Sequence, residues 1–217
     1  MYSLQTHNEK VAGVSSRIRQ FHETKQPFRI YHGSTNSTRE SQRRRDNTVD
    51  TSSLNHVLHI DVERKTALVE PNVPMDALVA ETVVKFRLVP LVVMEFPGIT
   101  VGGGFSGTSG ESSSFRYGAF DATINWVEIV LANGDVTRAY RTKEEKTDLF
   151  WGAASAFGTL GVVTLLEVQL KDAHPFVKLT YSLCDIASAN SMIQQEAGAS
   201  KLKPPRRPTG IRCTHMI

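Results

Sequence analysis

Apolar residues recur at helical spacing over residues 11–21, with charged and polar residues between them, which predicts an amphipathic helix. A second helix is expected over Met75–Phe86, because Pro74 suits a first helical turn and apolar residues lie along one side of that segment. A third helix is expected to begin near Asp148, with Thr147 or Asp148 itself as the capping residue.

Strand-like segments alternate irregularly with these helices, so the expected fold class is mixed α+β. The Asn133-Gly134 pair predicts a tight two-residue hairpin turn. The long β-branched segment at residues 162–170 is expected to lie in the centre of a sheet. The expected strands are residues 28–31, 57–61, 66–70, 88–93 with an interruption at Pro90, 126–131, 136–140, 162–170 and 177–181.

Composition excludes several classes of protein. The 217 residues allow one sizeable domain or two small lobes that share a core. The net charge of +3, from 25 basic and 22 acidic residues, is too even to indicate nucleic-acid binding. Cys184, Cys213 and the scattered histidines fit no metal-binding spacing, so no metal is expected. The lack of a signal peptide and of a membrane-length apolar run predicts a cytoplasmic location.

Two polar segments contain glycine beside small hydroxyl residues. Six glycines lie within residues 97–110, interleaved with small hydroxyl residues, and a second polar glycine turn covers residues 33–38. Because glycine has no Cβ, backbone N–H groups there can come close to a ligand, and clustered donors of this kind suit a phosphate or a flat polar cofactor. Two such segments predict a large, two-ended ligand such as a dinucleotide. The plainer alternative is that the glycines serve only tight turns.

The glycine segments do not fit two familiar nucleotide-binding motifs. Gly102, Gly104 and Gly107 have the spacing of the GxGxxG fingerprint, but a helix and several strands precede them. A polar segment at residues 111–114 also follows where a long helix should begin. Neither glycine segment contains a Walker lysine, so we expect neither a Rossmann site nor ATP hydrolysis.

Several short motifs occur in a fixed order along the chain. They are Gly33-Ser34-Thr35-Asn36-Ser37, Val69-Glu70-Pro71, Thr100-Val101-Gly102-Gly103, Tyr117-Gly118, Val130-Leu131-Ala132-Asn133-Gly134, Asp148-Leu149-Phe150-Trp151 and Gly158-Thr159-Leu160-Gly161-Val162-Val163. This order resembles the FAD-binding domain of the p-cresol methylhydroxylase and vanillyl-alcohol oxidase type (the PCMH type). Residues 107–114, together with residues 176–179, are similar to the delta(24)-sterol reductases of the DIMINUTO/DWARF type.

The resemblance implies an architecture of two α/β lobes with FAD between them. Lobe one would cover residues 8–95 and lobe two residues 96–181, so that the FAD-binding domain spans residues 1–181. Residues 182–217 are expected to form an irregular tail, or the truncated start of the cap domain that covers the flavin in this family.

The resemblance also assigns parts of FAD to parts of the chain. The segment at residues 33–38 would hold the pyrophosphate through backbone N–H groups, and residues 97–114 would line the other side of the FAD. Gly161 and Val162 would contact the adenine and ribose end. The full set of expected FAD-binding residues is Gly33, Ser34, Thr35, Asn36, Ser37, Pro97, Gly98, Thr100, Val101, Gly102, Gly103, Ser106, Ser109, Gly110, Ser113, Gly161 and Val162.

The FAD is expected to be held without a covalent bond. Covalent members of the superfamily often carry a histidine in the first loop, where this chain has residues 35–37. Related enzymes can have an active-site histidine where this chain has Gly110 or Glu111. His32, just before the first loop, leaves a covalent linkage open, and its plainer alternative is an ordinary histidine at the end of a strand.

The likeness to sterol reductases implies that hydride passes from NADPH to the flavin and then to an isolated side-chain alkene, with a proton from a protein acid. Glu111 is the one acidic residue in the second glycine segment and the candidate for that acid. The alternative is that Glu111 only bonds the loop backbone. The implied substrate is a small hydrophobic molecule such as a sterol, and the implied location is the endoplasmic reticulum membrane.

Two other functions stay open. The resemblance implies that family members continue into a cap domain, which residues 182–217 are not expected to form in full, so a truncated FAD-binding module without independent catalytic activity is one alternative. An oxygen-using oxidase of an alcohol or sugar is another, and the Glu-Ser-Ser-Ser segment at residues 111–114 favours the reductases over it.

Overall fold

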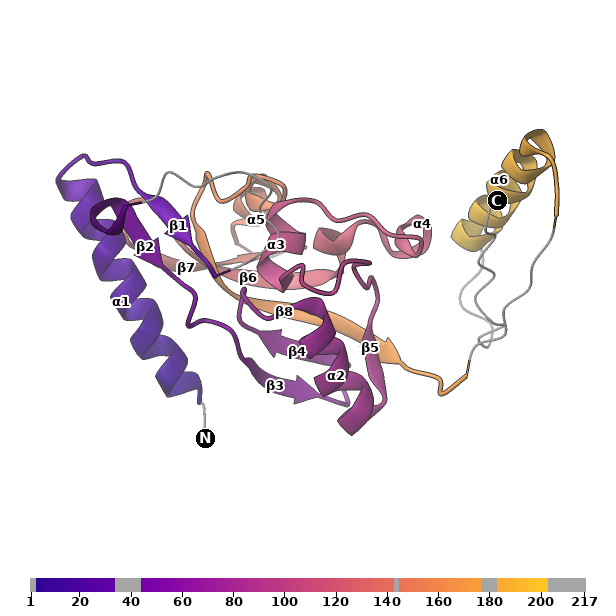
Figure 1. The fold of residues 1–217 in the computed structure, drawn as a ribbon, viewed down its shortest axis with the longest axis horizontal. Helices are drawn as coiled ribbons and strands as arrows, with labels where there is room; N and C mark the ends of the chain where they lie inside the picture. The colour runs from indigo at the N-terminus through magenta and orange to yellow at the C-terminus, as the bar shows by residue number, and fades with distance from the viewer. Residues whose placement is uncertain (1–2, 34–43, 143–144, 177–182, 203–217) are drawn as a thin grey trace. The chain divides into compact units, whose positions relative to one another are not determined.

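The structure is a computed structural model, and it describes residues 3–33, 44–142, 145–176 and 183–202. The chain divides into two compact units, Met1–Asp172 and Ala173–Ile217. In chain order, the first unit contains α1 (Leu4–Glu23), β1 (Arg29–Tyr31), the 3-10 helix η1 (Arg45–Asn47), β2 (Thr48–Asp50), β3 (Val57–Asp61), β4 (Thr66–Val69), α2 (Met75–Phe86), β5 (Leu88–Pro90), α3 (Val101–Ser106), α4 (Ser114–Tyr117), the 3-10 helix η2 (Phe120–Thr123), β6 (Ile124–Val130), β7 (Val136–Tyr140), α5 (Thr147–Ala153) and β8 (Val162–Asp172) (Figure 1).

One antiparallel sheet forms the frame of the first unit, with the order β3-β4-β8-β6-β7 and with β5 also paired to β8. Strand β8 runs for 11 residues and bonds β6, β4 and β5 in turn along its length. This confirms the prediction that residues 162–170 lie in the centre of a sheet. The predicted hairpins are confirmed as well, since β3 pairs with β4, and β6 pairs with β7 across the Asn133-Gly134 turn.

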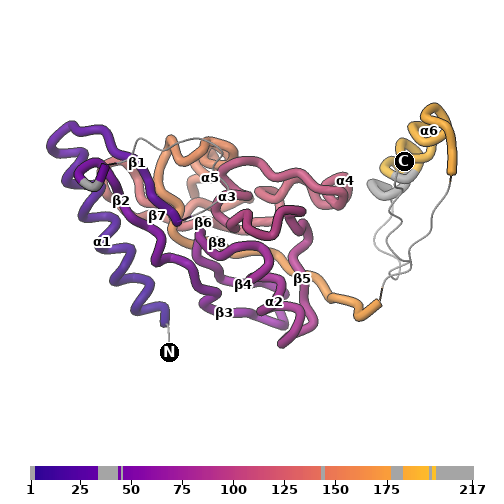
Figure 2. Tube along the Cα trace, viewed as in Figure 1, coloured from indigo at the N-terminus to yellow at the C-terminus, as the bar shows by residue number. Residues whose placement is uncertain are grey.

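Helix α1 lies along one side of the unit, near the short parallel pair of β1 and β2 (Figure 1, Figure 2). Ser3 caps its N-terminus, where the side-chain hydroxyl accepts a hydrogen bond from the backbone N–H of Thr6. Its buried residues recur every three or four positions and therefore share one face, as the sequence predicts. The apolar cluster under this face consists of Val11, Val14, Ile18, Phe21, Val49, Leu54, Val130 and Val162.

A larger apolar core joins the sheet to the helices α2, α3 and α5. Phe105 of α3, Phe120 of η2 and Phe150 of α5 are fully buried in it. The rings of Phe105 and Phe150 meet edge to face, with their centroids 5.3 Å apart. Because α3 contributes Phe105 to this core, the glycine-rich segment around Phe105 is anchored to the sheet.

The sheet crosses the boundary predicted between two lobes at residues 95 and 96. Strand β4, in the first predicted lobe, pairs along its whole length with β8, in the second. The structure instead has two apolar clusters within one unit, a small one under α1 and a large one under α2, α3 and α5. Local patterns do not reveal this arrangement, because the pairing joins segments that are far apart in the sequence.

The second unit contains α6 (Ile186–Leu202), which corrects the expectation of an irregular tail over these residues. Asp185 caps the start of this helix: its carboxylate accepts a hydrogen bond from the backbone N–H of Ser188 at 2.8 Å, and this bond lowers the pKa of Asp185. The first unit ends at Asp172, with β8. The strand predicted at residues 177–181 and the rest of the predicted tail lie outside the described residues.

Truncating the core ring of α3 tests this packing. We expect Phe105→Ala to lower the free energy of unfolding by about 3–5 kcal/mol, because it leaves a cavity beside Phe150. The matched control is Phe115→Ala, at a side chain that is 48% exposed, where a change within about 0.5 kcal/mol is expected. Urea unfolding followed by circular dichroism measures both variants, and equal losses would contradict the packing described.

Candidate cofactor site

A pocket of about 310 Å³ opens where the chain leaves β1 and β2, next to the start of α2. It is lined by His32, Gly33, Ser52, Asn55, Asn72, Pro74, Asp76, Gly98 and Thr100. The pocket brings the start of one predicted glycine segment, at Gly33, together with the other, at Gly98 and Thr100. The two segments that the sequence analysis links to one ligand therefore share a cavity.

Backbone hydrogen bonds fix the second glycine segment against the start of α2. The N–H of Met75 donates to the carbonyl of Ile99 at 2.9 Å, and the N–H of Asp76 donates to the carbonyl of Pro97 at 3.2 Å. The first amides of a helix have no partner inside it, so these bonds satisfy two of them. Helix α2 therefore sets the position of the pocket wall at Gly98.

The glycines after Thr100 form the short helix α3, which is not among the helices predicted from the sequence. Thr100 caps this helix, because its hydroxyl oxygen accepts a hydrogen bond from the N–H of Gly103 at 3.1 Å. Phe105 fixes the helix to the core from the other side. The second glycine segment is thus partly helical, and its geometry is set by a cap and by packing.

Gly102 has a packing role in α3. Its N–H donates to the carbonyl of Pro71 at 2.8 Å, and a Cβ on Gly102 would lie 2.6 Å from the Cβ of Pro71. Carbon atoms do not approach so closely, so glycine is what allows α3 to lie against residues 71–73. The N–H of Val101 donates to the carbonyl of Val73 at 2.9 Å in the same contact.

The N–H groups of the second segment therefore fall into two sets. Those of Val101, Gly102 and Gly103 donate to acceptors of the chain itself. Among the residues that the structure describes, no acceptor receives a hydrogen bond from the N–H of Gly98 or Thr100, and both residues line the pocket. Donors for a cofactor are thus expected at Gly98 and Thr100 rather than in the helix that follows.

Glu111 holds the backbone of the loop after α3. Its carboxylate accepts a hydrogen bond from the N–H of Glu95 at 2.9 Å, and its own N–H donates to the hydroxyl of Ser114 at 2.9 Å. The hydroxyl of Ser113 donates to the carbonyl of Leu91 at 3.2 Å. These contacts agree with the alternative in which Glu111 bonds the backbone, and neither Glu111 nor Ser113 lines the pocket.

Gly161 and Val162 have packing roles in the structure. A Cβ on Gly161 would lie 2.7 Å from the side chain of Ile129, and Val162 is buried under α1. Their contact with FAD stays a prediction. Four other predicted residues do not line the pocket, namely Pro97, Ser106, Ser109 and Gly110. The predicted residues that lie outside the described residues are Ser34, Thr35, Asn36 and Ser37.

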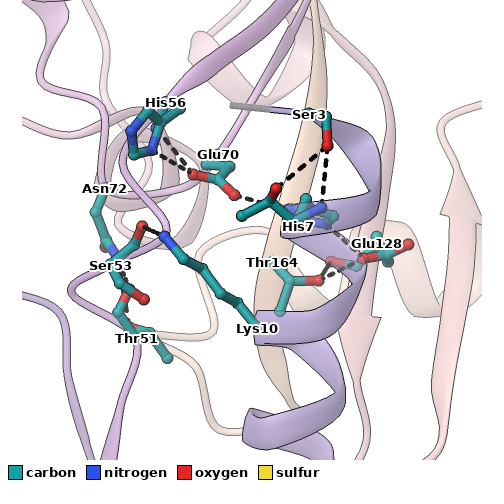
Figure 3. A network of polar contacts seen from close by, with 11 residues as sticks. Ser3, His7, Lys10, Thr51, Ser53, His56, Glu70, Asn72, Glu128 and Thr164 are labelled. Atoms are coloured by element: carbon teal, nitrogen blue, oxygen red, sulfur yellow. Dashed lines mark hydrogen bonds and ion pairs between the residues drawn. The ribbon is translucent and has the colours of Figure 1, made fainter. Parts of the chain in front are cut away.

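A buried ionic network, which no sequence pattern predicts, involves the segment next to the pocket (Figure 3). His7 of α1 lies between two carboxylates: its Nδ1 is 2.7 Å from Oε1 of Glu70, and its Nε2 is 3.2 Å from Oε1 of Glu128. His7 and Glu70 are fully buried. The signal available in the sequence is that His7 continues the apolar face of α1, one turn before Val11.

Hydrogen bonds complete this network. The hydroxyl of Thr164 donates to Oε1 of Glu128 at 2.9 Å, and the backbone N–H of His56 donates to Oε2 of Glu70 at 2.9 Å. Burial by itself lowers the pKa of His7, but hydrogen bonds and charge attraction from Glu128 and Glu70 outweigh it and raise this pKa to about 9. Burial raises the pKa of Glu128, and the hydrogen bond from His7 turns this into a net decrease. The two carboxyl groups therefore favour the protonated, cationic form of His7.

Comparison with known proteins shows the family of the chain. Residues 7–140, more than half of the sequence, match the family model of the FAD binding domain. The chain therefore belongs to the FAD binding domain family. This match confirms the predicted resemblance to PCMH-type FAD-binding domains and FAD as the cofactor.

Among curated relatives, the chain is similar to delta(24)-sterol reductases, as the sequence analysis expects. It is 39% identical over 155 residues to that of Pisum sativum, covering 69% of this chain and 27% of the relative. It is 35% identical over 129 residues to that of Homo sapiens, covering 59% of this chain and 24% of the relative. The chain thus spans about a quarter of the length of these relatives.

A solved structure has a similar fold. The chain superposes on 6-hydroxy-D-nicotine oxidase from Arthrobacter nicotinovorans with a TM-score of 0.63 and 24% sequence identity, over 75% of this chain and 35% of that one. This likeness concerns the fold alone, and it confirms the predicted α+β class.

Gly102→Ala tests the contact between α3 and residues 71–73. The added Cβ must push α3 away from Pro71, so we expect a loss of about 1–3 kcal/mol in the free energy of unfolding. Gly110→Ala is the matched control, because a Cβ on Gly110 would meet nothing within 4 Å. Chemical denaturation compares the two variants, and a Gly102→Ala protein as stable as the control would count against this contact.

Proposed function

We propose that the chain is the FAD-binding part of a reductase that uses NADPH to reduce an isolated C=C bond in a hydrophobic, sterol-like substrate. The observation that carries the proposal is the pocket shared by Gly33 of one glycine segment and by Gly98 and Thr100 of the other. The match to the FAD binding domain supports FAD as the ligand, and the similarity to delta(24)-sterol reductases supports the substrate class.

The pocket fits part of an extended FAD molecule. Its volume of about 310 Å³ is near the lower end of ligand pockets, which measure roughly 300–1,000 Å³, so it would enclose one section of the cofactor. The N–H groups of Gly98 and Thr100 are donors of the kind that hold phosphate or flavin oxygens without a fixed positive charge. The donor set is therefore suited to FAD.

Asp76 restricts which part of FAD this pocket receives. Asp76 lines the pocket, and its carboxylate accepts a hydrogen bond from the N–H of Ala77 at 2.7 Å. Because a carboxylate repels phosphate and attracts hydroxyl and N–H donors, we propose that the pyrophosphate lies against residues 34–37, which follow Gly33, and not beside Asp76. A hydroxyl- or N–H-bearing part of FAD would then face Asp76.

The chain's own residues would place and shield the cofactor, and FAD, when bound, would supply hydride transfer. Protonation of the alkene needs an acid within hydrogen-bond reach of the substrate. The carboxylate of Glu111 accepts the N–H of Glu95, which supports a backbone-holding role for Glu111 rather than that of the acid.

A sterol-like substrate resides in bilayers, so we propose that the protein acts at a membrane, and specifically at the endoplasmic reticulum as the resemblance implies. In the part of the chain that the structure describes, no helix is long and apolar enough to cross a membrane.

Acid precipitation tests how FAD is held. We expect the FAD-loaded protein to release yellow flavin into the supernatant, because residues 35–37 contain no histidine. His32 lines the pocket, so it is the residue to replace if the colour stays in the pellet, a result that contradicts non-covalent binding. In that event His32→Ala should free the flavin, whereas His22→Ala, at an exposed position of α1, should not.

Anaerobic mixing with NADPH tests the reductase half of the proposal. We expect the flavin absorbance to bleach, because reduction of the cofactor by NADPH precedes reduction of an alkene. Bound FAD that does not bleach would contradict the reductase and favour the alternative of an FAD-binding module without turnover of its own.

A matched pair of variants tests whether the bleaching depends on FAD bound in this pocket. Asn55→Trp fills the pocket with a large ring, so FAD uptake and bleaching should both be lost. Asn190→Trp makes the same change at an exposed position of α6, where both should persist. Equal FAD uptake by the two variants would show that FAD lies elsewhere.

A further inference from the structure

We propose that His7 is a positioning residue for the FAD site: held between Glu70 and Glu128, it fixes the segment at residues 70–73 on which the pocket and α3 rest. The inference depends on the proposed FAD binding, because it concerns the affinity of that site. It assigns a role to buried charges that lie outside the pocket lining.

The network joins three parts of the chain that are far apart in the sequence (Figure 3). His7 comes from α1, Glu70 follows directly after β4, and Glu128 lies on β6. The nitrogen atoms of His7 lie 2.7 Å from Glu70 and 3.2 Å from Glu128, and both His7 and Glu70 are fully buried. Helix α1 therefore holds the chain at the end of β4 through one side chain.

The residues after Glu70 build one side of the pocket. Asn72 lines the pocket and is held at both its side chain and its backbone. Its side-chain amide donates to the carbonyl of Thr51 at 2.5 Å, and its N–H donates to the carbonyl of Leu54 at 3.0 Å. A displacement of Glu70 would therefore pull Asn72 away from these partners.

The same segment carries α3. The carbonyls of Pro71 and Val73 accept the N–H groups of Gly102 at 2.8 Å and of Val101 at 2.9 Å. Thr100, which lines the pocket, directly precedes Val101 and caps α3. A shift of residues 70–73 would thus move two sides of the pocket together.

The positive charge on His7 keeps Glu70 and Glu128 close to each other. Two buried carboxylates without a cation between them repel each other and lack hydration, so one of them must move or take up a proton. His7 is the side chain that contacts both. The other polar and charged groups near the network are His56 beside Glu70, Lys10 of α1, Arg138 of β7 near Glu128, and Thr164 of β8.

This arrangement predicts that FAD affinity falls at alkaline pH. Burial lowers the pKa of His7, but Glu128 and Glu70 raise it from 6.5 to about 9. A basic group whose pKa is raised by folding contributes fully below its unfolded value and loses that contribution as the pH rises through its folded value. FAD should therefore bind well near neutral pH and more weakly as the pH passes about 9.

The test compares His7→Gln with His22→Gln, the same substitution at an exposed histidine in the last turn of α1. Quenching of flavin fluorescence gives the Kd for FAD of the full chain across this pH range, with circular dichroism to verify folding. We expect His7→Gln to bind FAD about tenfold more weakly at neutral pH and to lack the alkaline decrease. His22→Gln should match the wild type in both. A folded His7→Gln protein with wild-type affinity and pH profile would overturn the proposal.

Glu128→Gln gives an independent test if His7→Gln does not fold. Removing one of the two carboxylates lowers the pKa of His7, so the alkaline decrease in FAD affinity should begin at lower pH. An unchanged midpoint in this variant would refute the positioning role.

Hydrogen exchange separates this inference from the proposed function, because it needs no FAD. The amides of Val101 and Gly102 should exchange faster in His7→Gln than in His22→Gln, relative to the amide of Ala154 in the α5 turn. If the wild type binds no FAD but this difference appears, FAD binding fails as the function, and what stands is that His7 holds residues 70–73 and α3 in place. If the amides exchange alike in both variants, the positioning role fails whatever the result with FAD.

Discussion

The backbone pairing between residues 71–76 and 97–102 is the interaction on which the site depends. Its hydrogen bonds run from Met75 and Asp76 to the glycine segment, and from Val101 and Gly102 back to residues 71–73. These hydrogen bonds use main-chain atoms, so they restrict the sequence mainly through the size of the side chains that fit between the two segments. The contact between Gly102 and Pro71 is an example. Every residue that lines the pocket belongs to this pairing or lies within five residues after the end of β1 or β2.

The short parallel pair of β1 and β2 supplies the other half of the pocket. Parallel strands end at the same edge, so the residues after them, Gly33 and Ser52, are brought together there. The cluster under α1 holds this pair, and the larger core holds the glycine segment through Phe105. The site thus lies between two separately packed groups of side chains, and the ionic network around His7 links them.

Sequence patterns predict much of the fold because many of its signals are local. The periodicity of α1, the Pro74 start of α2 and the Asn133-Gly134 turn each specify an element within a few residues. Helix α3 is not predicted from the sequence, because its glycines have low helix propensity and its stability comes from a cap and from packing. The sequence motifs locate both glycine segments. They do not show which N–H groups remain available to a ligand in the pocket. The partners of His7 are 63 and 121 positions away in the sequence, so a local sequence pattern cannot predict these contacts.

The contacts of α1 with residues far away in the sequence have a consequence for folding during synthesis. Glu128 is synthesised 121 residues after His7, and β8 later still. At synthesis rates of about 5–20 residues per second, the contact between His7 and Glu128 can form no earlier than roughly 6–24 seconds after His7 is made. Since β8 pairs with β4, β5 and β6, the sheet cannot close until that last strand has left the exit tunnel.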